Sequence, residues 1–243
     1  MVTPATASIY EQPSLREIGG ETIRPGGLAL TDEALALCAL PPRARVLDVG
    51  CGAGATVAHL RTRHHLVAFG LDLSALLLRL HWQGNVAVPR LQAAGERLPI
   101  GSGQLDAILA ECSLSAMADV DRVLEEFERV LKADGILIVS DVYARNPDGL
   151  SALRPRPPGA CLSGLWSQTQ IAARLQTHGF QLTLWQDRSA ALKQLAVQLI
   201  MTHGSLQQFW QQTMAADAVP EVQRAMVVAR PGYYLLLARK GEA

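Results

Sequence analysis

The stretch Val46–Gly54, which reads VLDVGCGAG, decides the fold of this 243-residue chain. Val46–Val49 is typical of a short buried strand, and three glycines follow it before a helical pattern that runs from about Ala53 to Arg63. Glycines let the backbone turn tightly and let a ligand approach the main chain. A strand, a glycine loop and a helix in this order predict a ligand site at the carboxyl ends of the strands of a parallel sheet.

The spacing of the glycines narrows the choice of ligand. A dinucleotide fingerprint reads G-x-G-x-x-G, whereas Gly50, Gly52 and Gly54 form G-x-G-x-G. Asp48 precedes them, and its charge is awkward beside a pyrophosphate but suits a cationic ligand such as S-adenosylmethionine, which carries an ammonium and a sulfonium. Asp72, which closes the next apolar run, can accept both hydroxyls of a ribose. Sites for NAD and for S-adenosylmethionine share this last feature, so Asp72 alone does not separate them.

The rest of the chain alternates short apolar runs with helical patterns, which predicts an α/β fold with a parallel sheet covered on both faces. Residues 1–42 are expected to form an amino-terminal arm and helix, and residues 43–243 the main domain, with a helical insertion at about 188–228. The expected strands are 45–49, 66–71, 86–91, 105–110, 136–139, 180–185 and 233–239, and the expected helices outside the insertion include 74–83, 119–132 and 167–178.

Composition excludes several classes of protein. Hydrophobic residues make up 49% of the chain and charged residues 18%, as in folded globular proteins. Lys+Arg and Asp+Glu both number 22 without a basic cluster, which argues against nucleic acid as a partner. No apolar run approaches the ~20 residues of a membrane span. The amino terminus lacks a secretory pattern and the four cysteines lack zinc-ligand spacing, so we expect a cytoplasmic protein with no metal site.

Five segments, taken together, resemble the class I S-adenosylmethionine-dependent methyltransferases of the type 11 group. They are the glycine loop Val46–Gly54, Gly70–Ser74 (GLDLS), Glu96–Ile100 (ERLPI), Leu105–Leu109 (LDAIL) and Arg129–Gly135 (RVLKADG). The match runs in order over about residues 43–142. The resemblance implies a Rossmann-like, seven-stranded, mostly parallel sheet with one antiparallel strand. It also implies S-adenosylmethionine as methyl donor and S-adenosylhomocysteine as product.

The resemblance also implies which residues hold the donor. Asp72 would hold the ribose and Leu73 would lie against the adenine. Ala94 stands where the family often has an aspartate that accepts from the adenine amino group, so the backbone N–H of Gly95 is left to serve there, next to Glu96. The residues implied to line the methionine part are Asp48, Gly50, Cys51, Gly52 and Gly54, and Glu111 is expected to lie near the donor as well.

Two cysteines and two carboxylates are candidates for the acceptor side of the site. Cys112 follows the strand at 105–110 and Cys161 lies 49 residues further on, a pattern that resembles arsenite methyltransferases, in which such thiolates bind trivalent arsenic. That family has a further cysteine ahead of the glycine loop, which this chain lacks. The alternative is that both are ordinary buried cysteines. In that case Glu111 or Asp141, expected to end strands four and five, would assist a carbon or oxygen acceptor.

Four further possibilities stay open at this stage. The chain could be a catalytically silent subunit that binds S-adenosylmethionine and regulates a partner, and a nicotinamide dehydrogenase is the weakest alternative. The arm, which includes Tyr10 and Arg24, could fold over the donor or stay in solvent. The helical insertion could be a lid over a small-molecule acceptor or the surface of a homodimer.

Overall fold

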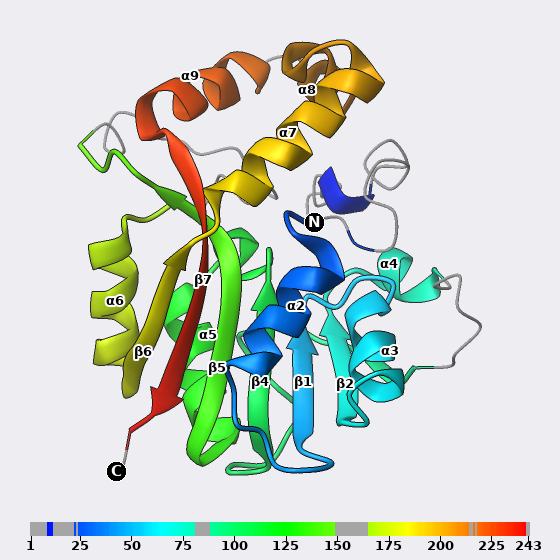
Figure 1. Cartoon of the computed structure of the whole chain (residues 1–243), viewed down its shortest axis with the longest axis vertical. Helices are drawn as coiled ribbons and strands as arrows, with labels where there is room; N and C mark the ends of the chain where they lie inside the picture. Colours follow the sequence, from blue (N-terminus) through cyan, green and yellow to red (C-terminus); the bar gives the residue numbers. More distant parts are fainter. Residues whose placement is uncertain are drawn as a thin grey trace, which may run out of the picture.

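A computed structural model of the chain describes residues 9–11, 22, 24–80, 88–148, 165–213, 216 and 218–241. A seven-stranded sheet with the strand order β3-β2-β1-β4-β5-β7-β6 forms its centre (Figure 1). Strand β7 runs antiparallel to both of its neighbours, and the other strand pairs are parallel. The predicted Rossmann-like, mostly parallel seven-stranded sheet is therefore confirmed.

The strands are β1 (Arg45–Val49), β2 (Val67–Asp72), β3 (Arg90–Gln92), β4 (Leu105–Glu111), β5 (Leu131–Ala144), β6 (Phe180–Asp187) and β7 (Pro231–Lys240). The α-helices are α2 (Gly27–Ala36), α3 (Ala55–Thr62), α4 (Ala75–Arg79), α5 (Val120–Val130), α6 (Gln168–Thr177), α7 (Ser189–His203), α8 (Leu206–Thr213) and α9 (Val219–Ala229). Two short 3₁₀ turns are η1 (Ile9–Glu11) and η2 (Leu114–Ala116).

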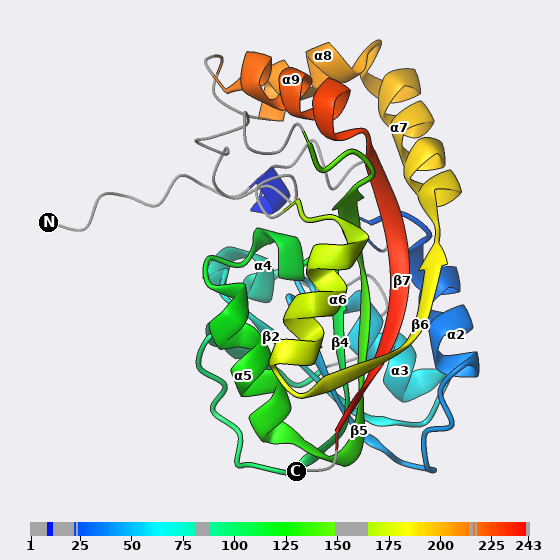
Figure 2. The same cartoon turned by 90° about the vertical axis from the view of Figure 1, so that its left-hand side faces the viewer.

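Helices cover both faces of the sheet, with α2 and α3 on one face and α5 and α6 on the other (Figure 2). Two separate apolar clusters, one on each face, fill the space between sheet and helices. Helix α5 shows why its sequence forms this layer. Val123, Phe127 and Val130 lie on one face and are fully buried, and the Asp119 side chain caps the helix by accepting from the Arg122 N–H at 3.1 Å.

Helices α7, α8 and α9, here called the helical cap, occupy the predicted insertion between β6 and β7. They lie beyond the carboxyl ends of the parallel strands, and η1 lies beneath them (Figures 1 and 2). The side chain of Tyr10 in η1 packs against the buried Leu199 and Phe209 of the helical cap. The helical cap and η1 thus lie at the end of the sheet at which the glycine loop is found.

Strand β5 is much longer than the predicted strand at 136–139. It pairs with β4 on one side and with β7 on the other, and the β7 register continues from Ile136↔Arg239 to Ala144↔Pro231. The polar residues Ser140 and Asp141 interrupt the apolar run in the sequence, but the sheet buries both of them completely. Strand β3 begins at Arg90, later than the predicted strand at 86–91.

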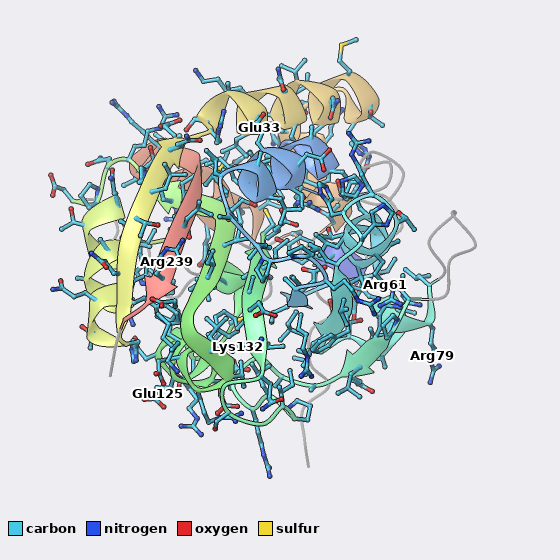
Figure 3. All side chains as sticks on the ribbon, turned by 60° about the horizontal axis from the view of Figure 1, so that its bottom comes forward. Glu33, Arg61, Arg79, Glu125, Lys132 and Arg239 are labelled. Atoms are coloured by element: carbon cyan, nitrogen blue, oxygen red, sulfur yellow. The ribbon has the colours of Figure 1, made fainter. Side chains whose placement is uncertain are left out.

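Charged side chains of both signs extend outward from the sheet and from its covering helices. Figure 3, with the amino ends of the parallel strands brought forward, shows Arg61 and Glu125 on α3 and α5, and Lys132 and Arg239 on β5 and β7. Among the described residues, no helix combines the length and the apolar character that a membrane crossing requires.

Candidate active site

The glycine loop between β1 and α3 is held by the end of β2. The N–H groups of Gly50 and Cys51 donate to the Leu71 carbonyl at 2.7 and 3.1 Å. All three loop glycines have positive φ, which side chains rarely tolerate. A Cβ on Gly50 would lie 2.4 Å from the Ser113 Cβ, whereas a Cβ on Gly52 would meet nothing within 4 Å. Gly52 therefore borders open space in which a ligand can touch the main chain.

Asp72 links the glycine loop to the start of α4. Its two carboxylate oxygens accept from the N–H groups of Gly52 and Ser74, each at 2.8 Å. Burial raises the pKa of Asp72, although these backbone hydrogen bonds oppose the rise. Each oxygen keeps a further lone pair for a ligand hydroxyl. The next residue, Leu73, is 70% exposed and offers an apolar surface beside this carboxylate.

Asp48, like Asp72, is a carboxylate of the site that forms no ion pair within the described residues. It lies in β1 and is 3% exposed, and no hydrogen bond to its side chain occurs within the described ranges. Burial, followed by the nearby charge of Glu111, raises its pKa to about 8; Arg24 opposes this rise, and Asp72 adds to it. A cationic ligand beside Asp48 would favour the ionised carboxylate.

Glu111 is paired with an arginine from the amino-terminal arm. Arg24, 8% exposed, brings Nη2 to within 2.8 Å of the Glu111 Oε2. Thr31 of α2 donates to Oε1 at 3.0 Å, and Thr56 of α3 donates to Oε2 at 3.4 Å. The predicted residue thus lies at the site, but its charge is neutralised and both oxygens are engaged. The Nε of Arg24 is buried and has no hydrogen-bond partner among the residues that the structure describes.

Asp141 does not end strand five, so that expectation is wrong. Strand β5 continues to Ala144, and Asp141 is 0% exposed within it. Its Oδ2 accepts from the Ser115 N–H at 2.8 Å, and its Oδ1 accepts from the Ser115 hydroxyl and the Val142 N–H, each at 2.7 Å. Burial raises its pKa to about 6, against the effect of these hydrogen bonds. Asp141 therefore positions the segment that follows β4.

Four further residues predicted to bind the methyl donor lie in the loop or near it. Cys51 directs its sulfur at β2, where a Cβ on Gly70 would lie 2.5 Å from Sγ, and burial raises the pKa of this thiol. Gly54 begins α3 with a φ of 90°. Gly95 is buried near Met117. The Glu96 side chain accepts from the Asp119 N–H at 3.4 Å, at the start of α5.

Cys112 lies directly after β4 in a left-handed backbone conformation with a φ of 54°. Non-glycine residues in this conformation are strained by about 1–3 kcal/mol and gather at functional sites. The half-buried Cys112 sulfur lies 3.5 Å from the Tyr233 hydroxyl, and its N–H donates to the Ser140 carbonyl at 2.7 Å. Cys161, the second predicted thiol, falls outside the described residues.

The network of Arg24 with Thr31, Thr56 and Glu111 was not anticipated from the sequence, because its members come from four separate segments. The Arg-Pro-Gly-Gly turn at 24–27 is the one sequence signal that could have pointed to it. A second unexpected contact connects the arm with the start of α4, next to Asp72. The Ser74 hydroxyl donates a hydrogen bond to Glu11 of η1. The arm therefore contacts both α4 and the helical cap.

Comparison with known sequences agrees with this geometry. Residues 47–139 match the methyltransferase domain family. The uncharacterized methyltransferase YodH of Bacillus subtilis is 29% identical over 163 residues, which are 65% of this chain and 69% of that protein. The malonyl-[acyl-carrier protein] O-methyltransferase of Laribacter hongkongensis is 35% identical over 123 residues. This second match covers 46% of the present chain and only 40% of that relative.

Solved structures share the fold over most of the chain. The [4+2]-cyclase SpnF has a TM-score of 0.63 at 26% identity, over 88% of this chain and 81% of its own. Phosphoethanolamine N-methyltransferase 2 of Haemonchus contortus, solved with phosphomonomethylethanolamine and S-adenosylhomocysteine, has a TM-score of 0.71 at 15% identity. That match covers 97% of this chain and 57% of the other.

The fold, the glycine loop and the match of residues 47–139 define an S-adenosylmethionine-dependent methyltransferase domain in this chain. Its activity is methyl transfer to a small molecule.

Proposed function

We propose that this enzyme binds S-adenosylmethionine across the glycine loop and methylates a small nucleophile enclosed beneath the helical cap and η1. The observation that carries the proposal is the set of three carboxylates, Asp48, Asp72 and Glu111, gathered around the loop with Arg24 as their close cation. Three carboxylates with one close cation suit a ligand that carries an ammonium and a sulfonium, because such a ligand favours the ionised form of Asp48.

The residues present fit the donor. Asp48 is free to face its cationic end, Asp72 retains lone pairs for the ribose hydroxyls, and exposed Leu73 can cover an adenine face. The open space at Gly52 lets the ligand approach the main chain. The buried, unpartnered Nε of Arg24 is a donor available to the ligand carboxylate.

When bound, S-adenosylmethionine supplies an electrophilic methyl group whose C–S bonding pair returns to sulfur as the acceptor forms its new bond. The protein has to hold the acceptor in line and exclude water, and positioning alone is worth about 7–11 kcal/mol. The helical cap and η1 provide the enclosure. Glu111 is neutralised and Asp141 is buried, so neither is placed to remove a proton from the acceptor. The geometry therefore favours an acceptor that presents a lone pair unaided.

A thiophilic acceptor, such as a trivalent arsenical or a thiolate, meets this requirement. In this proposal Cys112 and Cys161 hold the soft atom, and the strained backbone at Cys112 supports a functional role for that residue. The other open acceptors are carbon or oxygen atoms, and an O-methyltransferase among the relatives supports the second of these.

The test is a titration of reduced protein, loaded with S-adenosylhomocysteine, with a monosubstituted trivalent arsenical. We expect one equivalent to bind, and Cys112→Ser and Cys161→Ser each to weaken binding at least about tenfold. Cys38→Ser is the matched control, because Cys38 is buried in the core on the α2–α3 face and should not affect binding. Equal binding in all variants, or none in the wild type, would move the search to oxygen, nitrogen and carbon acceptors.

A catalytically silent donor-binding subunit is the competing hypothesis. It predicts that S-adenosylmethionine binds but that no acceptor, thiophilic or otherwise, yields S-adenosylhomocysteine. Formation of S-adenosylhomocysteine above the acceptor-free rate with any acceptor would exclude this hypothesis.

The raised pKa of Asp48 predicts opposite effects of pH on stability and on donor binding. The unfolded chain ionises this carboxyl near its ordinary value of 3.8, whereas the folded protein retains the proton up to about 8. The contribution of Asp48 to stability is therefore complete below about pH 4 and is lost as the pH rises to about 8. Because the cationic donor favours ionised Asp48, its affinity should rise by up to about tenfold per pH unit below 8.

Calorimetry with S-adenosylmethionine at several pH values between 6 and 8 measures how the affinity for the methyl donor depends on pH. Asp48→Asn carries no titrating carboxyl, so the pH dependence of its weaker binding should be flat. A slope in Asp48→Asn as steep as that of the wild type would show that another group is responsible.

A further inference from the structure

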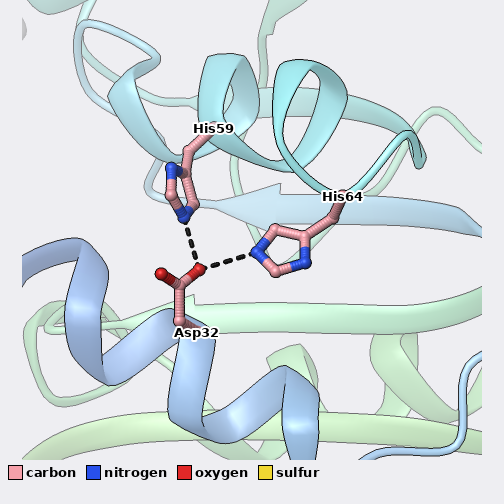
Figure 4. A group of neighbouring side chains, drawn as sticks. All are labelled: Asp32, His59 and His64. Atoms are coloured by element: carbon pink, nitrogen blue, oxygen red, sulfur yellow. Dashed lines mark hydrogen bonds and ion pairs between the residues drawn. The ribbon is translucent and has the colours of Figure 1, made fainter.

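Three side chains of types that bind metal ions lie close together where α2 passes α3. None of them belongs to the residues assigned to methyl transfer. Asp32 comes from α2, His59 from α3 and His64 from the turn that follows α3 (Figure 4). Both imidazole Nε2 atoms lie 2.6 Å from the same oxygen, Oδ1 of Asp32. One ligand atom from each of the three residues lies within 4.8 Å of the other two.

The cluster is accessible and carries suitable charge. The side chains of His59, His64 and Asp32 are 14%, 26% and 32% exposed, which leaves a path to solvent and room for water ligands. Burial would raise the pKa of Asp32, but the hydrogen bonds of the two histidines and the charge of Arg63 lower it overall. The carboxylate is therefore ionised at neutral pH and available as a ligand.

A role in core packing alone explains the geometry of these three side chains less well than a role in binding a cation does. Two imidazole rings, 5.3 Å apart and edge to face, direct their Nε2 atoms at a single oxygen, although Asp32 has a second one. That second oxygen lies 3.4 Å from the Nε of Arg63, whose side chain is 66% exposed and can move into solvent. A cation between the three ligand atoms would take the place of the two Nε2 protons that now hydrogen-bond to Oδ1.

We propose that Asp32, His59 and His64 form a binding site for a divalent transition metal of the zinc type, with water in the open positions. Two imidazole nitrogens and one carboxylate oxygen are typical zinc ligands, and the same set binds Co²⁺ and Ni²⁺. Mg²⁺ and Ca²⁺ prefer all-oxygen sites and should bind poorly. Ligand bonds of about 2.0–2.2 Å require the three ligand atoms to move by roughly 1 Å or less from their present spacing.

A metal bound at this position would connect two helices and so stabilise the fold. Helix α2 directly follows the segment that carries Arg24, and α3 directly follows the glycine loop. A bound metal would join these two helices at the surface, on the outer side of the Glu111 network. Because the three ligands come together only in the folded chain, the metal should raise the temperature of unfolding.

The experiment uses the full chain without a histidine tag. Calorimetry with Zn²⁺ should show one site per chain, and Co²⁺ should give a visible absorption band from the bound ion. Asp32→Asn, His59→Gln and His64→Gln should each weaken Zn²⁺ binding at least tenfold. His65→Ala is the matched control, because this exposed histidine adjoins His64 but lies outside the cluster, and it should bind as the wild type does.

Thermal unfolding of each variant without metal shows whether the variant is folded. Zn²⁺ should raise the unfolding temperature of the wild type and of His65→Ala, but not that of the three ligand variants. Absence of Zn²⁺ binding by the wild type would overturn the proposal, as would equal binding by Asp32→Asn and His59→Gln. Mg²⁺ that bound as tightly as Zn²⁺ would contradict the proposed zinc-type selectivity.

Discussion

Replacing Arg24 by methionine should lower the free energy of unfolding by about 3–5 kcal/mol, because it leaves the buried carboxylate of Glu111 without its cation. Arg24 and Glu111 have side chains that are only 7% and 4% exposed, and their charged atoms lie 2.8 Å apart. Thr31 and Thr56 donate to the same carboxylate but cannot neutralise it. Chemical denaturation of the donor-free protein measures the change.

Two further variants separate the lost charge from lost packing. Arg122→Met removes an exposed ion pair with Glu125, whose partners are 54% and 50% exposed, and should cost at most about 0.5 kcal/mol. The double variant Arg24→Met, Glu111→Leu removes both buried charges and should recover much of the lost stability. An Arg24→Met protein no less stable than Arg122→Met would show that the buried pair does not stabilise the fold.

The central part of the sheet was predictable because its signals are local. Strands β1 and β4 are short apolar runs, and the glycine loop has a spacing that depends only on neighbouring residues. The predicted strands at 45–49 and 105–110 therefore lie close to the observed ones. Helix α5 was likewise predictable from its apolar stripe and from Asp119 at its start.

The features of the fold and the site that were not predicted depend on contacts between residues far apart in the sequence. The length of β5 is fixed by its antiparallel partner β7, and that pairing buries Asp141 where the sequence placed it at a strand end. Glu111 was correctly placed at the carboxyl edge, but its pairing with Arg24 spans 87 residues and has no local pattern. The contact of Asp32 with His59 shows the same limit, since the two residues are 27 positions apart and no local pattern links them.

Gly52→Ala should weaken donor binding strongly while leaving the protein folded. Gly52 has a φ of 53°, so an alanine there is strained by about 1–2 kcal/mol, but its Cβ would meet no protein atom within 4 Å. The space that the Cβ enters is the space proposed for the ligand. Crowding of this kind costs up to about 3 kcal/mol, so the dissociation constant for S-adenosylhomocysteine should rise about 100-fold.

Gly103→Ala separates backbone strain from ligand exclusion. Gly103 has a φ of 64° and also has nothing within 4 Å of an added Cβ, but it lies in the turn before β4, at the opposite edge of the sheet. Both alanine variants should lose similar stability in thermal unfolding, and only Gly52→Ala should lose affinity in calorimetry. If Gly52→Ala bound S-adenosylhomocysteine as tightly as Gly103→Ala does, the donor could not lie against the main chain at Gly52.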